Sequence, residues 1–300
     1  MIDVMRSSVN TWECDQMGHM NVRHYSARAA DGLARLAVEL GLGPRRLEEA
    51  GLAVRAVEQH LRFHREMRPG AAFRVQAGVI EAREERLRIF QEMRMAGDDV
   101  LVATIVTDAV LVQSSTFHHV PWPKEAVTRA GALATALPEH GAPRGIAAGP
   151  PRSPVPSYDE ARRLVGAYLG PVTRDDCDEK GFMREAAYLA RVSDGVPHFF
   201  RSLRRGDNPA GVGGAALEYR FAYHGRPRAG DLIEMRVGLK AVARKTIHFC
   251  HWIFDVESSR CVSTSEAVAV SLDLTTRKAI DFRDDERAVL EAHVVPRLAM

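Results

Sequence analysis

The chain repeats itself on either side of its midpoint. CDQMGHM at residues 14–20 matches CDEKGFM at residues 177–183 at its Cys, Asp, Gly and Met positions, with an offset of 163 residues. Residues 58–70 can be laid on residues 218–230 with an offset of 160, and Glu, His, Arg and Gly then coincide. Several matches in one order, at nearly one offset, indicate an internal duplication. We therefore expect two units of similar fold within the 300 residues, each long enough to bury its own core.

A proline-rich segment separates the two copies. Residues 137–157 hold six prolines among small residues. Proline lacks a backbone N–H and has a fixed φ, so neither a helix nor a central strand is expected there. We predict an N-terminal domain at 1–125, a linker rich in Pro, Ala and Gly at 126–160, and a C-terminal domain at 161–300.

Both copies show the same order of secondary-structure signals. After a polar loop, apolar residues recur at helical spacing over 25–40 and again over 186–203. Gly195 and Pro197 interrupt the second pattern, which predicts a kink or a break there. Strand-like runs then follow at 87–95, 100–112, 247–253 and 261–274. One long helix against an antiparallel sheet is an α+β layer architecture.

Composition and charge exclude several classes of function. The net charge is +2 and no block of lysine and arginine stands out, so a nucleic-acid partner is not expected. The start of the chain has no signal-peptide pattern, and no apolar run approaches the ~18–20 residues that span a bilayer, so no membrane partner is expected. The four cysteines form no CxxC pair, which disfavours zinc and redox motifs and fits reduced thiols in the cytoplasm.

The loop before the first helix carries the most informative motif. Asp15, Gly18, His19 and Asn21 stand in the order D-x-x-G-H-x-N, with Tyr25 following on the helix. This order resembles the hotdog-fold acyl-CoA thioesterases of the 4-hydroxybenzoyl-CoA thioesterase superfamily. The resemblance covers most of residues 1–122, and in the second half it rests partly on the repeat.

A second block, V-E-Q-H at 57–60, leads to Phe63 and resembles thioesterases of carnitine and betaine breakdown. The resemblance implies an α+β fold of two tandem hotdog domains. Each would be a long helix wrapped by an antiparallel β-sheet, and the two would be paired as a pseudo-dimer. It also implies hydrolysis of a small-molecule acyl-CoA to free acid and CoA. Coenzyme A would be part of the substrate, and neither a metal nor another cofactor would be needed.

The loop residues suit this chemistry. Asp15 can act as general base or as nucleophile on the thioester. Backbone amides at the helix N-terminus, near Asn21 and Val22, can stabilise the oxyanion because the first helical N–H groups have no internal partner. Gly18 would let the backbone approach the acyl group, and His19 and Asn21 can orient water or bind the carbonyl. Capping of the helix by Asn21, and bracing of the loop by Asp15, are the structural alternatives.

A strand supplies further candidates. Glu58, His60 and His64 alternate along one run, so we expect all three to point to one face. Glu58 is predicted as a second catalytic carboxylate, and the alternative is a structural salt bridge. For His60 and His64 the alternative is that they are ordinary strand residues. The predicted catalytic residues are thus Asp15, His19, Asn21 and Glu58, and the predicted substrate-binding residues are Gly18, Val22, Tyr25, His60 and Asp178.

The second loop departs from the motif. Gly-His-Met-Asn becomes Gly181-Phe182-Met183-Arg184, so the Asp and Gly remain while the His and Asn are lost. Many relatives also have a second Asn where this chain has Val22. A working second site is therefore in doubt. For Asp178, which is predicted to bind substrate, the alternative is a structural role.

Other functions remain open at this point. An acyl-ACP thioesterase is one alternative, because plant-type enzymes of that class are also tandem hotdogs. A non-catalytic acyl-CoA binding protein is another. A hydratase is less favoured, because its sequence context is missing. The acyl chain is not predicted, and a homodimer stays possible.

Overall fold

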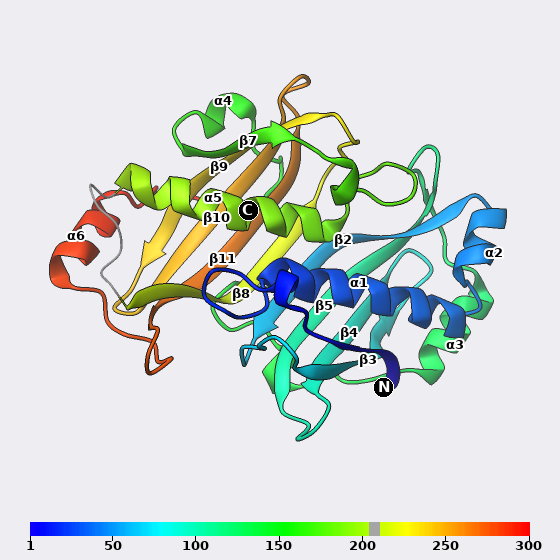
Figure 1. Ribbon diagram of the computed structural model, residues 1–300. Helices are drawn as coiled ribbons and strands as arrows, with labels where there is room; N and C mark the ends of the chain where they lie inside the picture. The colour runs from blue at the N-terminus through cyan, green and yellow to red at the C-terminus, as the bar shows by residue number, and fades with distance from the viewer. Residues whose placement is uncertain (204–210) are drawn as a thin grey trace. The chain divides into compact units, whose positions relative to one another are not determined.

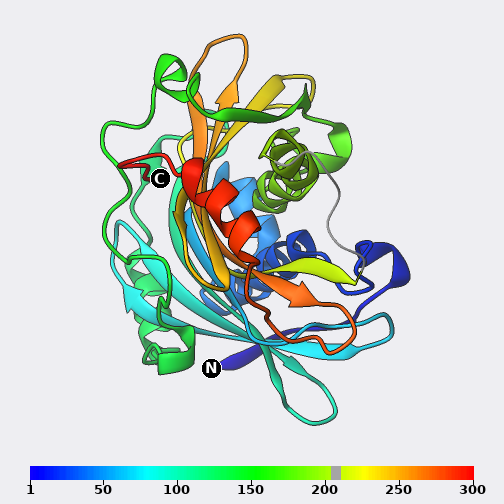
Figure 2. The ribbon, with the colours of Figure 1, turned by 90° about the vertical axis from the view of Figure 1, so that its left-hand side faces the viewer.

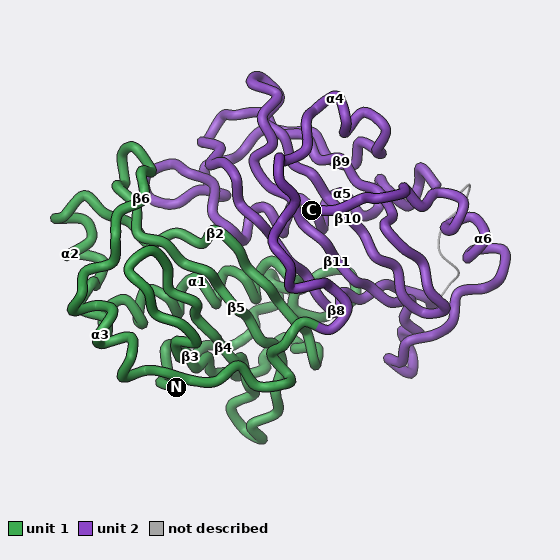
Figure 3. Tube along the Cα trace, turned by 180° about the vertical axis from the view of Figure 1, so that it is seen from behind, with its two compact units in different colours: residues 1–143 green, residues 144–300 purple. Residues whose placement is uncertain are grey.

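The computed structural model describes residues 1–203 and 211–300. The chain forms two compact units, Met1–Pro143 and Arg144–Met300 (Figure 3). The boundary lies within residues 126–160, where the sequence predicts a linker; the linker itself stays a prediction. Among the described residues, no helix has both the length and the apolar character needed to cross a bilayer.

Unit 1 is a curved antiparallel sheet with one long helix lying on it (Figure 1). Its strands pair in the order β1-β3-β4-β5-β2, and β6 pairs with β5. The elements are β1 (Ile2–Ser8), η1 (Thr11–Glu13), α1 (Val22–Glu39), α2 (Pro44–Glu49), β2 (Leu52–Phe63), β3 (Ala72–Ala82), β4 (Leu87–Met95), β5 (Leu101–Gln113), β6 (His119–Val120), α3 (Lys124–Ala132) and η2 (Glu139–Gly141).

Unit 2 repeats this plan. Its strands pair in the order β7-β9-β10-β11-β8, and Figure 2 looks nearly along α5 on the inner side of the curved sheet. The elements are α4 (Tyr158–Ala161), β7 (Val165–Pro171), η3 (Arg174–Asp176), α5 (Glu185–Leu203), β8 (Val212–Tyr223), β9 (Leu232–Val242), β10 (Thr246–Asp255), β11 (Cys261–Asp273) and α6 (Asp284–Ala292). The predicted α+β class, with one long helix on an antiparallel sheet in each unit, is confirmed.

Of the kink or break predicted in the second long helix, the break is wrong, and the kink stays a prediction. Pro197 lies inside α5, which continues without interruption to Leu203. Phe199 and Leu203, beyond the proline, are both buried. Burial of a large apolar side chain contributes about 1.5–3 kcal/mol, so packing of the last turns offsets a proline penalty of about 3 kcal/mol.

The central helix of unit 1 lies very close to its sheet. A Cβ added at Gly32 would come within 2.9 Å of Val4 Cγ2 and of Gln91 Nε2. Gln91 is fully buried, and its Nε2 donates a hydrogen bond of 2.9 Å to the Ala29 carbonyl of α1. Gly195 is the corresponding residue of α5 at the offset of 163. The repeat therefore preserves a small residue at the crossing of helix and sheet.

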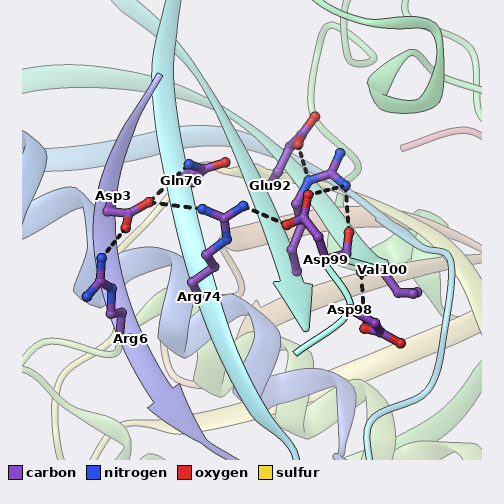
Figure 4. A network of polar contacts seen from close by, with 9 residues as sticks. Asp3, Arg6, Arg74, Gln76, Glu92, Asp98, Asp99 and Val100 are labelled. Atoms are coloured by element: carbon purple, nitrogen blue, oxygen red, sulfur yellow. Dashed lines mark hydrogen bonds and ion pairs between the residues drawn. The ribbon is translucent and has the colours of Figure 1, made fainter. Parts of the chain in front are cut away.

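A polar network ties the edge of the sheet to the turn between β4 and β5 (Figure 4). Arg74 on β3 donates to Asp99 Oδ1 at 2.6 Å and lies 3.6 Å from Asp3 Oδ1 on β1. Gln76 Nε2 also donates to Asp3, at 3.0 Å, and Arg94 Nη1 donates to the Asp99 carbonyl at 2.9 Å. Exposed pairs of this kind contribute about 0–1 kcal/mol each, so the network adds little to stability.

Candidate functional site

The loop before α1 folds into a tight turn around Asp15. The Asp15 amide donates to the His19 carbonyl at 3.0 Å, and the Gly18 amide donates to the Asp15 carbonyl at 3.0 Å. The Met17 amide donates to Asp15 Oδ1 at 2.9 Å. Gly18 has a φ of 76°, where glycine is favoured, and open space surrounds the position of a Cβ. Backbone conformation therefore explains Gly18 within this turn.

His19 lies between two carboxylates. Its Nδ1 is 3.7 Å from Asp15 Oδ2, and its Nε2 is 3.5 Å from Glu66 Oε1. The exposed fractions of the side chains are 19% for Asp15, 12% for His19 and 30% for Glu66. The group is therefore mostly buried, and Glu66 is its most exposed member. The sequence reasoning missed Glu66, because it follows the end of β2 and belongs to no periodic pattern.

Asn21 caps α1. Its Oδ1 accepts a hydrogen bond of 3.0 Å from the Arg23 amide, and its own amide donates to the Glu13 carbonyl at 2.8 Å. The His24 amide donates to the Asn21 carbonyl at 2.9 Å. Within the described contacts of this first turn, the Val22 amide is left without a protein acceptor. Val22 N–H is thus the amide that can receive a developing negative charge at the positive end of the helix.

A buried carboxylate anchors the loop in each unit. Glu13 accepts a hydrogen bond of 2.8 Å from the Asn10 amide and is paired with Arg28 of α1. Burial by itself would raise the pKa of Glu13, but the Asn10 bonds and the Arg28 charge outweigh it and hold that pKa below its ordinary value. Asp176 and Arg191 form the same pair in unit 2. The frame of the two loops is therefore conserved between the repeats.

Tyr25 is a packing residue of α1. Its ring meets Phe63 of β2 edge to face, with centroids 5.1 Å apart, and the side chain is 3% exposed. Burial raises the pKa of the Tyr25 hydroxyl. Tyr25 thus fixes α1 against β2 directly beside the loop.

The structure does not bring Glu58 and His60 into this group. Ser26 of α1 donates to Gln59 Oε1 at 3.4 Å, so Gln59 faces the helix and its neighbours along β2 face away. Arg62, on the same side as Glu58, donates to the Ala142 carbonyl at 2.6 Å. By this alternation Glu58 and His60 are assigned to the face opposite α1, and their common face stays a prediction.

Glu58 lies instead beside a second carboxylate. It pairs in register with Asp108 of β5, which is 6% exposed and 3.3 Å from Arg86 Nη1. Burial raises the pKa of Asp108, and the nearby Glu58 charge adds to this rise. The strand ends at Phe63, and the predicted third member, His64, lies beyond it with its ring 6.4 Å from that of His140.

The second loop has the same backbone and different chemistry. Asp178 Oδ1 accepts hydrogen bonds of 3.0 Å from the Lys180 and Phe182 amides, and Gly181 has a φ of 81°. Arg226 stands where unit 1 has Glu66, and its Nη2 lies 3.8 Å from Asp178 Oδ2.

Two guanidinium groups pack on the ring that replaces the imidazole. Arg226 and Arg228 lie 5.8 Å and 4.5 Å from the centroid of the Phe182 ring. Arg184 stands at the position of Asn21 and has no side-chain acceptor for the helix amides. Unit 2 therefore keeps the turn and loses both the imidazole and the asparagine cap.

Metal-binding geometry is not found in the described part of the chain, where no group of three or more His, Cys, Asp or Glu side chains is arranged to hold an ion. The site consists of a carboxylate, an imidazole, a second carboxylate and a helix N-terminus. This set can activate water and stabilise an oxyanion.

Comparison with known proteins gives a family match and several matches of fold. The model of the thioesterase-like superfamily matches residues 9–131 and 172–291, one copy in each unit. No curated protein matches the chain. A protein from Lactobacillus plantarum, assigned as an oleoyl thioesterase, has a TM-score of 0.70 at 14% identity over 89% of this chain and 95% of its own.

Two acyl-ACP thioesterases have similar structures. The enzyme from Bacteroides thetaiotaomicron has a TM-score of 0.66 at 12% identity, over 88% of this chain and 96% of its own. The 12:0-ACP thioesterase from Umbellularia californica has a TM-score of 0.67 at 11% identity, over 89% of this chain and 93% of its own. At such identities the likeness concerns the fold, which is a tandem of two hotdog units.

Proposed function

The chain belongs to the thioesterase-like superfamily, and from this premise we propose that it hydrolyses acyl thioesters to a free acid and a thiol at the loop of unit 1. The observation that carries the proposal is the placement of Asp15 in a tight turn immediately before the capped N-terminus of α1. The segment from Asp15 to Val22 thereby supplies both a carboxylate that can act as a base and a helix N-terminus that can stabilise an oxyanion.

Asp15 acts as the general base in this proposal. Its Oδ1 is held by the Met17 amide, which leaves Oδ2 on the His19 side to take a proton from water. The water oxygen bonds to the thioester carbon as its O–H bond breaks, and the carbonyl oxygen becomes negative. The intermediate then collapses with loss of the thiolate, a good leaving group that needs little acid assistance.

The oxyanion would be received by the Val22 amide. One such donor, placed before the reaction begins, typically lowers the barrier by about 3–4 kcal/mol. The positive end of the 18-residue helix α1 adds to this stabilisation. The Asn21 cap uses Oδ1 only, so its side-chain N–H groups are suited to the same carbonyl oxygen or to water.

The proposed enzyme works with one loop of this kind. In unit 2 the carboxylate of Asp178 faces Arg226, and Phe182 cannot exchange protons. In unit 2 a guanidinium group thus stands beside the aspartate, and at the position of His19 no imidazole faces it. Asp178 is therefore assigned a structural role in its loop.

The proposed carrier is coenzyme A, with acyl carrier protein as the second candidate. The likeness of fold to two acyl-ACP thioesterases favours the second candidate, and the V-E-Q-H block at 57–60 favours a small polar acyl group on CoA. The four cysteines are free, which fits a proposed location in the cytoplasm, where thiols stay reduced.

Free-thiol release from short, long, aromatic and betainyl acyl-CoAs, and from matched acyl-ACPs, tests this function. Asp15→Asn should lower kcat by about 10²–10⁴-fold, the usual contribution of general base catalysis. Asp159→Asn, on the exposed surface of α4, is the control. Tight binding of the thioesters without turnover would indicate a binding protein, and an unchanged kcat for Asp15→Asn would remove Asp15 from the mechanism.

A further inference from the structure

The described contacts give His19 a partner that the motif does not contain. His19 Nε2 is sealed from solvent and has no hydrogen bond, while Glu66 Oε1 faces it at 3.5 Å. A buried polar atom in this position requires an explanation. Hydrogen bonds at active sites are often long before substrate binds and shorten in the reacting complex, so this pair has the geometry of such a contact.

The repeat provides an internal comparison for this pair. At the corresponding positions unit 2 has Phe182 and Arg226, so the imidazole and the carboxylate have been replaced together. The loop frame survived these replacements: the bridge between Cys14 and Met20 recurs between Cys177 and Met183. Glu66 is therefore not needed to fold a loop of this kind, which separates it from the residues of the frame.

We propose that Glu66 is a positioning residue that orients His19 toward Asp15, an inference that rests on the proposed function. Glu66 accepts a hydrogen bond from Nε2–H and selects the tautomer in which Nδ1 has no hydrogen. Nδ1 then faces Asp15 Oδ2, from which it lies 3.7 Å away, as an acceptor.

The benefit arises only after proton transfer. When Asp15 has taken the proton from water, its Oδ2–H can donate to Nδ1, whereas the ionised carboxylate of the resting state cannot. The interaction is stronger after transfer than before it, so it lowers the barrier and leaves substrate binding unchanged. The proton then returns to solvent or to the departing thiolate, and Asp15 is ionised again.

This role differs from the one predicted for Glu58. The sequence predicts a second carboxylate at Glu58, whereas that side chain lies on the face of the sheet opposite α1. Glu66 follows the end of β2, where the chain turns back past the loop, and the Met67 carbonyl accepts the Met20 amide at 2.8 Å. The backbone next to Glu66 is thus fixed to the loop that it serves.

A double-mutant cycle on the full chain tests the proposal. Glu66→Gln should lower kcat by about 10- to 100-fold with KM within about twofold, since only a step after binding is affected. In a His19→Gln background the same change should have less than about a twofold effect, because Glu66 acts through the imidazole. Glu66→Asp should recover part of kcat, and Glu49→Gln on the exposed surface of α2 is the matched control.

Imidazole nitrogen spectra of the resting protein give a readout that does not depend on turnover. With ring ¹⁵N-labelled histidine, and His19 assigned from the His19→Gln spectrum, the wild type should show hydrogen on Nε2. Glu66→Gln should shift the His19 nitrogens, and Glu49→Gln should leave them in place.

The outcomes separate the two proposals. Absence of turnover by the wild type would reject the proposed function, while the spectra would still decide the positioning role. Normal turnover with an unchanged His19 spectrum in Glu66→Gln would reject Glu66 alone. Equal loss of kcat in both His19 backgrounds would show that Glu66 acts independently of the imidazole, which would also overturn the inference.

Discussion

Asn21 provides the sharpest test of the proposed oxyanion site, because capping and catalysis predict different results for the same substitution. Asn21→Asp keeps a side-chain oxygen that can accept the Arg23 amide, as Oδ1 does at 3.0 Å. It also places a negative charge at the end of α1 where the oxyanion would form. Asn21→Ala removes the cap without adding charge.

The magnitudes follow from the loss of a cap and from the repulsion of two charges at short range. Loss of the cap in Asn21→Ala should cost about 1 kcal/mol in the free energy of unfolding. Asn21→Asp should preserve or slightly raise stability, because Asp is an equally good cap and complements the helix dipole. Two unit charges about 5 Å apart at an effective dielectric of about 20 repel by about 3 kcal/mol, which is about a hundredfold loss in kcat.

Urea unfolding and steady-state thiol release should be measured on both variants. We expect Asn21→Asp to keep the stability of the wild type and to have a much lower kcat. We expect Asn21→Ala to be less stable than the wild type but to have a higher kcat than Asn21→Asp. A substitution at Asp31, an exposed residue of the same helix, is the control for general effects on α1. Full activity in Asn21→Asp would refute the placement of the oxyanion at this helix end, and unchanged stability in Asn21→Ala would refute the cap.

Two further predictions concern the frame around the site. Gly32→Ala should destabilise unit 1 by about 1–3 kcal/mol, because its Cβ would lie 2.9 Å from Val4 Cγ2. Thermal unfolding checks this prediction. An unchanged midpoint temperature would show that α1 can move off the sheet to make room for the methyl group. Glu13→Gln should cost about 1–3 kcal/mol at pH 7, because it breaks the Arg28 pair. Since the pKa of Glu13 is lowered in the folded chain, this stabilisation is present above the unfolded pKa of about 4.3 and is lost as the pH falls through the folded value. The free energies of unfolding of the wild type and of Glu13→Gln should therefore converge in acid. A difference between them that stays constant from pH 7 to pH 3 would contradict the shift.

The fold could be predicted from the sequence because its signals are local and repeated. The loop with an Asp and a Gly three residues later occurs in both halves, and apolar residues at helical spacing follow it where α1 and α5 form. The break predicted near Pro197 does not occur, because burial of the last turns of α5 outweighs the local cost of proline. Local propensity is commonly overridden in this way by tertiary packing.

The site could be predicted only in part. Asp15, His19 and Asn21 lie within one short segment, so chain connectivity alone brings them together, although their catalytic roles remain predictions. Period two predicts a common face for Glu58 and His60, but the face turned toward α1 is decided by packing. No rule of sequence spacing could have found Glu66, because its approach to His19 depends on the path of the chain after β2.

The reversal of charge from Glu66 to Arg226 shows what tandem duplication permits. In an assembly of identical subunits every substitution appears in all copies, so a change that silences one active site silences them all. Here the two copies are separate stretches of one gene product, and the second could exchange an acid for a base while the first kept its own. Under the proposed function, selection on the second loop acts on folding alone, and the turn that is retained around Asp178 fits that expectation.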